Sequence, residues 1–168
     1  MPEMTDAREL FLHELGDMLY AENKLVKALP KMAKEATDDE LRAGFTEHLE
    51  QTRGQVDRIE RSFASLGEKA SAEQCPGIEG IIEEHDEFMK ENDPSAEICD
   101  LFLTGAGART EHYEIAAYSG LIVMARALGE REVVDLLSES LREEKETLKS
   151  LEQASRRLAK ERVKATAS

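Results

Sequence analysis

Long stretches of the chain repeat apolar residues at steps of three, four and seven, the spacing of one face of an α-helix. Three such stripes are Leu12, Leu15, Leu19, Val26 and Leu29; Leu41, Phe45, Thr52, Val56, Ile59 and Phe63; and Val133, Leu137, Leu141, Leu148, Leu151 and Leu158. Residues 94–128 are apolar over most of the helix circumference, so we expect them to form the most buried helix. No stretch shows the strict alternation of a half-buried strand, and the sequence therefore predicts an all-α protein.

Local signals place the ends of the first two helices. The first is expected to begin near Thr5 or Asp6 and either to kink or to end early at Pro30, which cannot donate a helical hydrogen bond. The second is expected to open with the T-x-x-E capping box 37-TDDE-40 and to stop near Gly67.

Three further helices follow. A short one is expected over residues 78–90, and the next begins with a cap and a proline at 92-NDP-94 and runs to Leu128. The last covers residues 130–160. The connections before the second and before the last helix are short, whereas the middle connection is long and carries the short helix. Two antiparallel hairpins joined by one long crossover make a ferritin-like four-helix bundle, which we predict for residues 1–160, followed by a flexible basic tail at 161–168.

The charge balance restricts the possible partners. The formal net charge of the chain is -14, which should repel nucleic acid and anionic membranes. The N-terminus lacks the basic and then apolar pattern of a signal peptide, and no apolar run approaches the length of a membrane span. We therefore expect a cytoplasmic protein, in which Cys75 and Cys99 are buried thiols rather than a disulfide.

Ionisable residues interrupt the apolar faces near the middle of each long helix. They are Glu22, His48, Glu111, Glu114 and Glu144. Because all five lie on core faces near mid-helix, an antiparallel bundle could bring them to a similar height. No Lys or Arg lies on the same stripes to pair with them. Isolated buried carboxylates cost several kcal/mol or become protonated, so a bound cation is the natural missing partner.

The residue types indicate which cation. Glu and His suit iron or manganese, and two divalent ions would balance four carboxylates. Di-iron carboxylate bundles take a Glu from each of two helices and Glu-x-x-His from each of the other two. This chain has no Glu-x-x-His, places Thr147 where the second His would be expected, and offers five candidate ligands rather than six. One good and one weaker metal position, completed by water, would fit this set.

Five segments carry a resemblance to a known family. They are 11-FLHELGDMLYAENKLVKALPKMA-33, 48-HLEQTRGQVDRIE-60, 75-CPGIEGIIEE-84, 111-EHYEIAAYSGL-121 and 141-LREEKETLKSL-151. In these segments the chain resembles the YciE/YciF stress-protein family, also called the ferritin-like DUF892 domain, over nearly its whole length. The resemblance implies a ferritin-like bundle, a homodimer, a role linked to stress and a di-metal site of the rubrerythrin kind.

Two functions remain open at this point. The first is a metal-dependent oxidoreductase with two iron or manganese ions, which would react with peroxide or dioxygen as a catalase, peroxidase or ferroxidase. The second is a non-enzymatic dimeric stress protein whose inward carboxyl groups are protonated or linked by water. The side chains near the cluster also have two interpretations: Tyr118, Thr52 and Thr147 could support ligands, or could belong to the core and bond to the backbone.

Overall fold

The computed structural model describes residues 4–166 and consists, over that range, of five α-helices without a strand. The helices are α1 (Ala7–Glu35), α2 (Asp39–Ser65), α3 (Pro76–Asn92), α4 (Ala96–Leu128) and α5 (Arg131–Thr166). The predicted all-α class and the order of four long helices with one short helix in the crossover are therefore confirmed.

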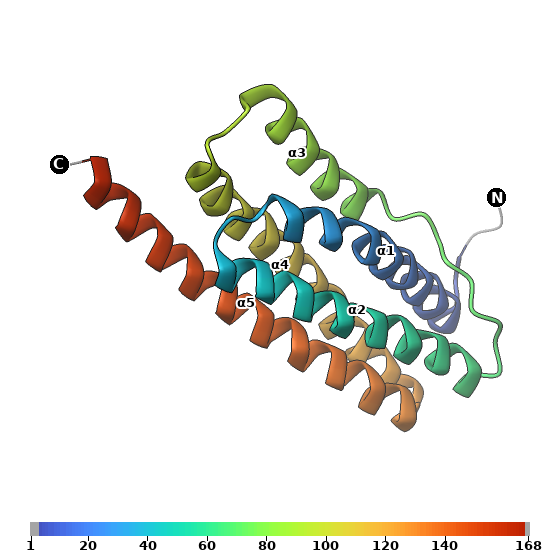
Figure 1. Cartoon of the computed structure of the whole chain (residues 1–168). Coiled ribbons are helices and arrows are strands. Elements are labelled where there is room, and N and C mark those ends of the chain that lie inside the picture. The colour runs from blue at the N-terminus through green and yellow to red at the C-terminus, as the bar shows by residue number, and fades with distance from the viewer. Residues whose placement is uncertain (1–3, 167–168) are drawn as a thin grey trace.

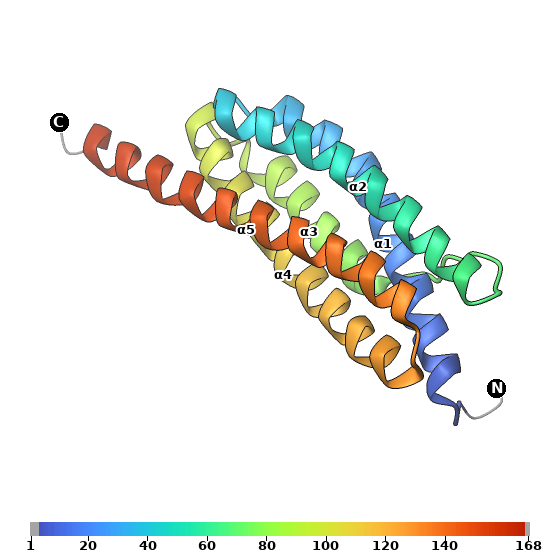
Figure 2. The ribbon, with the colours of Figure 1, turned by 90° about the horizontal axis from the view of Figure 1, so that it is seen from below.

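The four long helices form a ring. Helix α1 packs against α2 and α4, and α5 packs against the same two helices (Figures 1 and 2). Helix α3 lies outside this ring, along α1 and α4. The last turns of α5 project beyond the other helices, as both views show. The result is the bundle of two hairpins and one crossover that the connection lengths predicted.

The crossover passes very close to α1 at Gly16. The backbone N–H of Glu73 donates to the Gly16 carbonyl at 3.0 Å. A Cβ atom at Gly16 would lie only 2.7 Å from the Ser71 carbonyl oxygen. A glycine is therefore needed for the crossover to approach the helix at this point.

The start of α2 differs from the prediction by one residue. Asp38, not Thr37, is the N-cap, and its carboxylate accepts from the Leu41 N–H at 2.9 Å. The Thr37 hydroxyl donates instead to Asp100 of α4 at 2.6 Å, and its N–H donates to the same carboxylate at 2.7 Å. The capping box from Thr37 is wrong because a residue distant in sequence takes that hydroxyl.

Other helix ends also differ. Helix α1 continues past Pro30 to Glu35, so the early end is wrong; Met32 and Ala36 are buried beyond the proline, and this packing holds the last turn. A kink at Pro30 stays a prediction. Helix α4 is capped at Ser95 rather than within 92-NDP-94, because Asp93 adopts a left-handed backbone (φ 40°) at the end of α3.

Helix α5 continues six residues past Lys160, through a run of good helix formers. The tail predicted at 161–168 is therefore helical as far as Thr166, and its last two residues lie outside the described part of the chain. Its flexibility stays a prediction.

Two apolar clusters fill the bundle, one toward each end. One contains Leu25, Leu29, Phe45, Leu103 and Leu151 among others, and the second contains Phe11, Leu15, Ile59, Phe63 and Leu137 among others. Between them, at mid-bundle, lies a layer of buried polar side chains. Cys75 and Cys99 are both buried free thiols. No helix within residues 4–166 has the length and hydropathy required to cross a membrane.

Candidate metal centre

Four of the five predicted ligands converge in the polar layer. His48 of α2, Glu111 and Glu114 of α4 and Glu144 of α5 each offer one ligand atom, and these four atoms all lie within 4.8 Å of one another. The four residues are at most 2% exposed. A buried His and Glu cluster of this size could hold a metal ion.

Glu22 of α1, the fifth candidate, is fully buried but lies beside this group of four rather than within it. Its Oε1 atom accepts a hydrogen bond from the Tyr118 hydroxyl of α4. Its carboxyl group neighbours that of Glu114, and each affects the pKa of the other. Glu22 therefore extends the cluster toward α1.

His48 presents its two ring nitrogens to different surroundings. Nε2 lies 3.2 Å from Glu111 Oε1 and 3.8 Å from Glu144 Oε2. Nδ1 lies 3.3 Å from Gln51 Oε1 and 3.3 Å from Thr147 Oγ1. Gln51 Oε1 can only accept, which favours the tautomer with the proton on Nδ1 and leaves the Nε2 lone pair facing the carboxylates.

Gln55 is a site residue that the sequence analysis missed. Its amide is completely buried and donates to Glu144 Oε1 and, at 3.1 Å, to Glu143 Oε2. The signal was present, because Gln55 follows His48 by seven residues and so lies on the same helix face. Gln55 holds Glu144 in place from the neighbouring helix.

A buried cation, Arg58, also lies on α2, beside the apolar stripe rather than on it. The Arg58 side chain is 10% exposed. Its guanidinium donates to Ser140 Oγ at 3.0 Å and pairs with Glu143 and Glu139. The buried face of α2 is therefore wider at Arg58 than the apolar stripe alone indicated, because polar residues of α5 cover this side chain. Arg58 thus bonds to Ser140, Glu139 and Glu143 rather than to the four clustered side chains.

The three neighbouring hydroxyl groups divide between their two interpretations. Tyr118 supports a candidate ligand directly, through its bond to Glu22. Thr147 contacts His48 Nδ1 and donates to Gln51 at 3.3 Å. Thr52 bonds back to the His48 carbonyl at 2.8 Å, which is the backbone interpretation.

The cluster contains buried polar atoms that lack a hydrogen-bond partner among the described residues. These atoms are Glu22 Oε2, His48 Nε2, Glu111 Oε2, both carboxyl oxygens of Glu114, and Glu144 Oε2. Buried polar groups in native proteins are nearly always satisfied, and each exception requires an explanation. Atoms of this kind, lone pairs on oxygen and imidazole nitrogen, are ligands for iron, manganese or zinc.

Burial and mutual repulsion disfavour the charged carboxylates. Burial raises the pKa of Glu22 to about 8, and the charge of Glu144 adds to this rise. Burial likewise raises the pKa of Glu111 to about 7. The pKa values of Glu114 and Glu144 are raised well above the usual range. Burial is the largest cause for both. The charges of the neighbouring carboxylates add to the rise for Glu114, and the adjacent carboxyl group of Glu111 adds to it for Glu144. Without a cation, the cluster therefore retains protons at neutral pH.

The comparison with known proteins identifies the family. The family model described as "Domain of unknown function (DUF892)" matches residues 6–164. The chain belongs to the DUF892 family. It is 38% identical over 145 residues to Protein YciF of Escherichia coli (strain K12), an alignment that covers 86% of this chain and 87% of that protein.

Solved structures agree with this assignment. The crystal structure of the E. coli stress protein YciF matches with a TM-score of 0.88 and 35% identity, covering 94% of this chain and 99% of YciF. YcfI of Rhodopseudomonas palustris, described as a candidate structural protein, matches with a TM-score of 0.87 and 39% identity, covering 89% and 95%. A protein of Xanthomonas campestris pv. campestris, at 23% identity and a TM-score of 0.72, supports the fold alone.

In this DUF892 chain the buried cluster draws on all four long helices when Glu22 is included. The donor set contains one imidazole and four carboxyl groups, whereas a symmetric di-iron bundle has two imidazoles. Chemically, the arrangement suits a hard or borderline divalent ion and leaves positions for water or a small ligand.

Proposed function

We propose that the chain is a metal-dependent stress protein, which binds iron or manganese in the mid-bundle cluster and reacts there with peroxide or dioxygen. The observation that carries the proposal is the set of buried, unpartnered oxygen and nitrogen atoms that converge from α2, α4 and α5. The stress association comes from the similarity to the E. coli stress protein YciF.

The residues would divide the binding as follows. His48, Glu111 and Glu144 would hold one ion. Nε2 of His48 already lies 3.2 Å from Glu111 Oε1 and 3.8 Å from Glu144 Oε2. Glu114 and Glu22 would hold a second ion, and two divalent charges would balance the four carboxylates. Tyr118 and Gln55 would orient Glu22 and Glu144.

The bound metal would supply the change of oxidation state that reactions of peroxide and dioxygen require. The chain itself excludes bulk water, because apolar clusters close the bundle on both sides of the polar layer. Binding of the metal would also displace the protons that the metal-free carboxyl groups retain. Metal uptake should therefore release protons into the solvent.

The test is turnover by the protein after it is loaded with Fe(II) or with Mn(II). We expect the loaded protein to consume hydrogen peroxide or dioxygen faster than the same concentration of free metal. The variant His48→Ala should lose this activity, whereas His112→Ala, which changes an exposed histidine of α4, should retain it. Equal rates for loaded protein and free metal would contradict the redox part of the proposal.

A second candidate is a non-enzymatic stress protein without metal. The observation that favours it is that Glu144 and Glu114 lie where, when protonated, they can donate to Glu111 and Glu22. Two shared protons would partly satisfy the cluster. Infrared spectra would then show protonated carboxyl groups at pH 7 that persist after incubation with Mn(II), and that isosteric Glu→Gln changes remove.

We also propose a homodimer, which the family resemblance implies, and a cytoplasmic location, which the N-terminal sequence and the lack of a long apolar run favour. Light scattering of the purified chain should give about twice its 18.8 kDa mass. A monomer at micromolar concentration would contradict the dimer without affecting the metal site.

A further inference from the structure

Polar side chains of α2 and α5 meet along the seam between these helices next to the metal centre. Gln51 and Gln55 of α2 face Thr147 and Glu143 of α5 along this seam. The two ends of the bundle are filled by apolar clusters, and Leu41, Phe45 and Leu151 of one cluster also lie along this seam. A charged ligand that must reach the buried cluster would therefore meet a lower desolvation cost along the polar part of the seam than through either apolar cluster.

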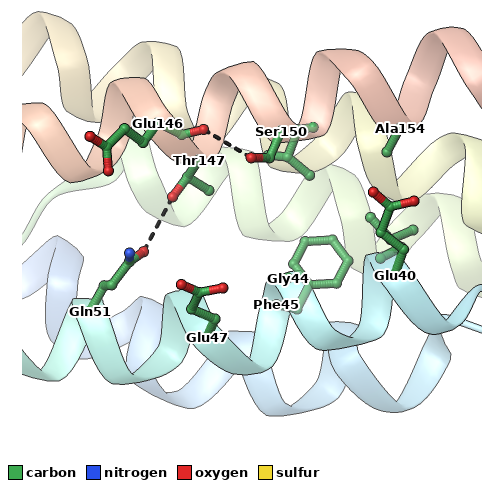
Figure 3. A pocket seen from close by; sticks show the side chains of 11 residues that line it. Glu40, Gly44, Phe45, Glu47, Gln51, Glu146, Thr147, Ser150 and Ala154 are labelled. Carbon is green, nitrogen blue, oxygen red and sulfur yellow. Dashed lines mark hydrogen bonds between the residues drawn. The ribbon is translucent and has the colours of Figure 1, made fainter.

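A pocket of about 240 Å³ opens on this seam. Figure 3 shows Glu47, Gly44 and Phe45 of α2 facing Thr147 and Ser150 of α5 across it. Gln51 and Thr147, which bond to each other in Figure 3, also line the pocket. Both contact Nδ1 of His48, whose opposite nitrogen faces Glu111 and Glu144. One imidazole ring and its two partners thus separate the pocket from the cluster.

We propose that this pocket is the entry site for the divalent metal ion, with Gln51 and Thr147 forming the gate to the cluster. The inference rests on the proposed metal binding, because a route requires a site at its end. Its occupant is a hydrated divalent cation in transit, which the pocket captures before the buried carboxylates replace its water.

The size and charge of the pocket suit that occupant. The pocket offers about 240 Å³ to water-sized molecules, which leaves room for several waters around an ion. Glu47 supplies a carboxylate there, and among the residues that the structure describes it forms no ion pair. Glu40 and Glu146 also line the pocket but already pair with Arg157 and Arg142. Glu47 is therefore the side chain that should attract the cation.

The gate consists of weak contacts. The three distances among His48 Nδ1, Gln51 Oε1 and Thr147 Oγ1 are all 3.3 Å, beyond the usual range of a strong hydrogen bond. Rotation of the Gln51 side chain would thus break little, and would uncover the imidazole from the pocket side. The gate can open without separating the helices.

The test is the rate of Mn(II) uptake by the metal-free full-length chain, followed by stopped flow with a competing fluorescent chelator. The variant Gly44→Leu should fill the pocket without a clash, because a Cβ at Gly44 has no neighbour within 4 Å. We expect it to slow uptake by roughly tenfold or more, since the ion must then wait for local opening of the bundle. The final metal content should match that of the parent protein.

The matched control is Gly80→Leu on α3, where a Cβ also has no neighbour within 4 Å and the residue lies outside the pocket. It should leave the uptake rate unchanged. Glu47→Gln should slow uptake by about twofold to fivefold at low salt, and the difference should vanish at high salt. Glu60→Gln, an exposed carboxylate on the same helix, should not slow it to the same extent.

The outcomes separate the route from the site. Uptake by Gly44→Leu at the parent rate, with full loading, would overturn the entry pocket and leave the metal-binding function intact. Equal slowing in Gly44→Leu and Gly80→Leu would also overturn it. No uptake by the parent protein would overturn both proposals.

Discussion

The hydroxyl of Tyr118 donates a hydrogen bond to Oε1 of Glu22 across the α1–α4 interface, and both side chains are completely buried. This contact leaves Oε2 as the unpartnered atom of Glu22 and aims it toward the polar layer. The Glu22 carboxylate belongs to α1 but is held by Tyr118 of α4. Its position therefore depends on correct packing of these two helices.

Removal of this hydroxyl should affect both stability and metal binding. Tyr118→Phe should lower the free energy of unfolding by about 1–3 kcal/mol, because Glu22 loses its donor in a buried site. It should also weaken metal binding by roughly tenfold or more, through loss of the orienting bond. Urea unfolding and Mn(II) titration would measure the two effects.

Tyr20→Phe is the matched control, because Tyr20 makes the same kind of bond to Glu79 outside the cluster. It should leave the Mn(II) affinity unchanged. If the two variants weakened Mn(II) binding equally, Tyr118 would have no specific role at the site.

The metal-free protein should lose stability as the pH rises. Folding raises the pKa of Glu111 from 4.5 to about 7 and that of Glu22 from 4.5 to about 8. Between these values the folded state binds more protons than the unfolded state, so the free energy of unfolding falls with increasing pH. We expect a loss on the order of a few kcal/mol between about pH 5 and pH 8.

Urea unfolding in the presence of a chelator at pH 5, 6, 7 and 8 would measure this dependence. The lowered pKa of Glu79, about 2, acts in the opposite direction but only below about pH 4.5, outside this window. Saturating Mn(II) should reduce the loss, since the bound ion balances the carboxylates. A stability that rises from pH 5 to pH 8 without metal would be incompatible with buried, proton-retaining carboxyl groups.

Gln55 should matter more at high pH than at low pH. Gln55→Leu removes the amide donor from Glu144, and the ionised form of that carboxylate suffers most. We expect destabilisation of about 1–3 kcal/mol at pH 8 and less at pH 5. Thermal unfolding at the two pH values would show the difference, with Gln74→Leu, at an exposed position, as the control. An effect independent of pH would mean that only packing was lost.

Gly16 tests how the crossover is fixed to the bundle. Gly16→Ala places a methyl group 2.7 Å from the Ser71 carbonyl oxygen, so the crossover backbone must shift. We expect a loss of about 1–3 kcal/mol in thermal unfolding and faster proteolysis within residues 66–75. Gly80→Ala in α3 has open space and should instead be neutral or slightly stabilising. Equal stability of the two variants would contradict the close contact.

The helical bundle could be predicted from the sequence because its determinants are local. Apolar spacing defines each long helix, and short connections before Asp39 and Arg131 require antiparallel neighbours. The same spacing placed His48, Glu111 and Glu144 on inward faces, and the structure brings them together. The position of each of these residues along its helix was therefore enough to predict that it lies in the cluster.

What the sequence could not show depends on partners that are distant in the chain. Thr37 fails as a cap because Asp100, 63 residues away, accepts its hydroxyl. Arg58 can be buried because Glu143 and Ser140 of α5 accept hydrogen bonds from its guanidinium group. Gln55 was missed for the same reason: a glutamine is neutral in a helical pattern, and only its bond to Glu144 gives it a role.

The measurement that tests the account most directly is the metal content per chain by mass spectrometry, after purification without chelator and after reconstitution with Fe(II) or Mn(II). The account predicts one to two tightly held ions per chain, two being the number that balances the charge of four carboxylates. They should be lost in Glu111→Ala and retained in Glu60→Gln. A content near zero under all conditions, or equal retention in both variants, would contradict the metal centre.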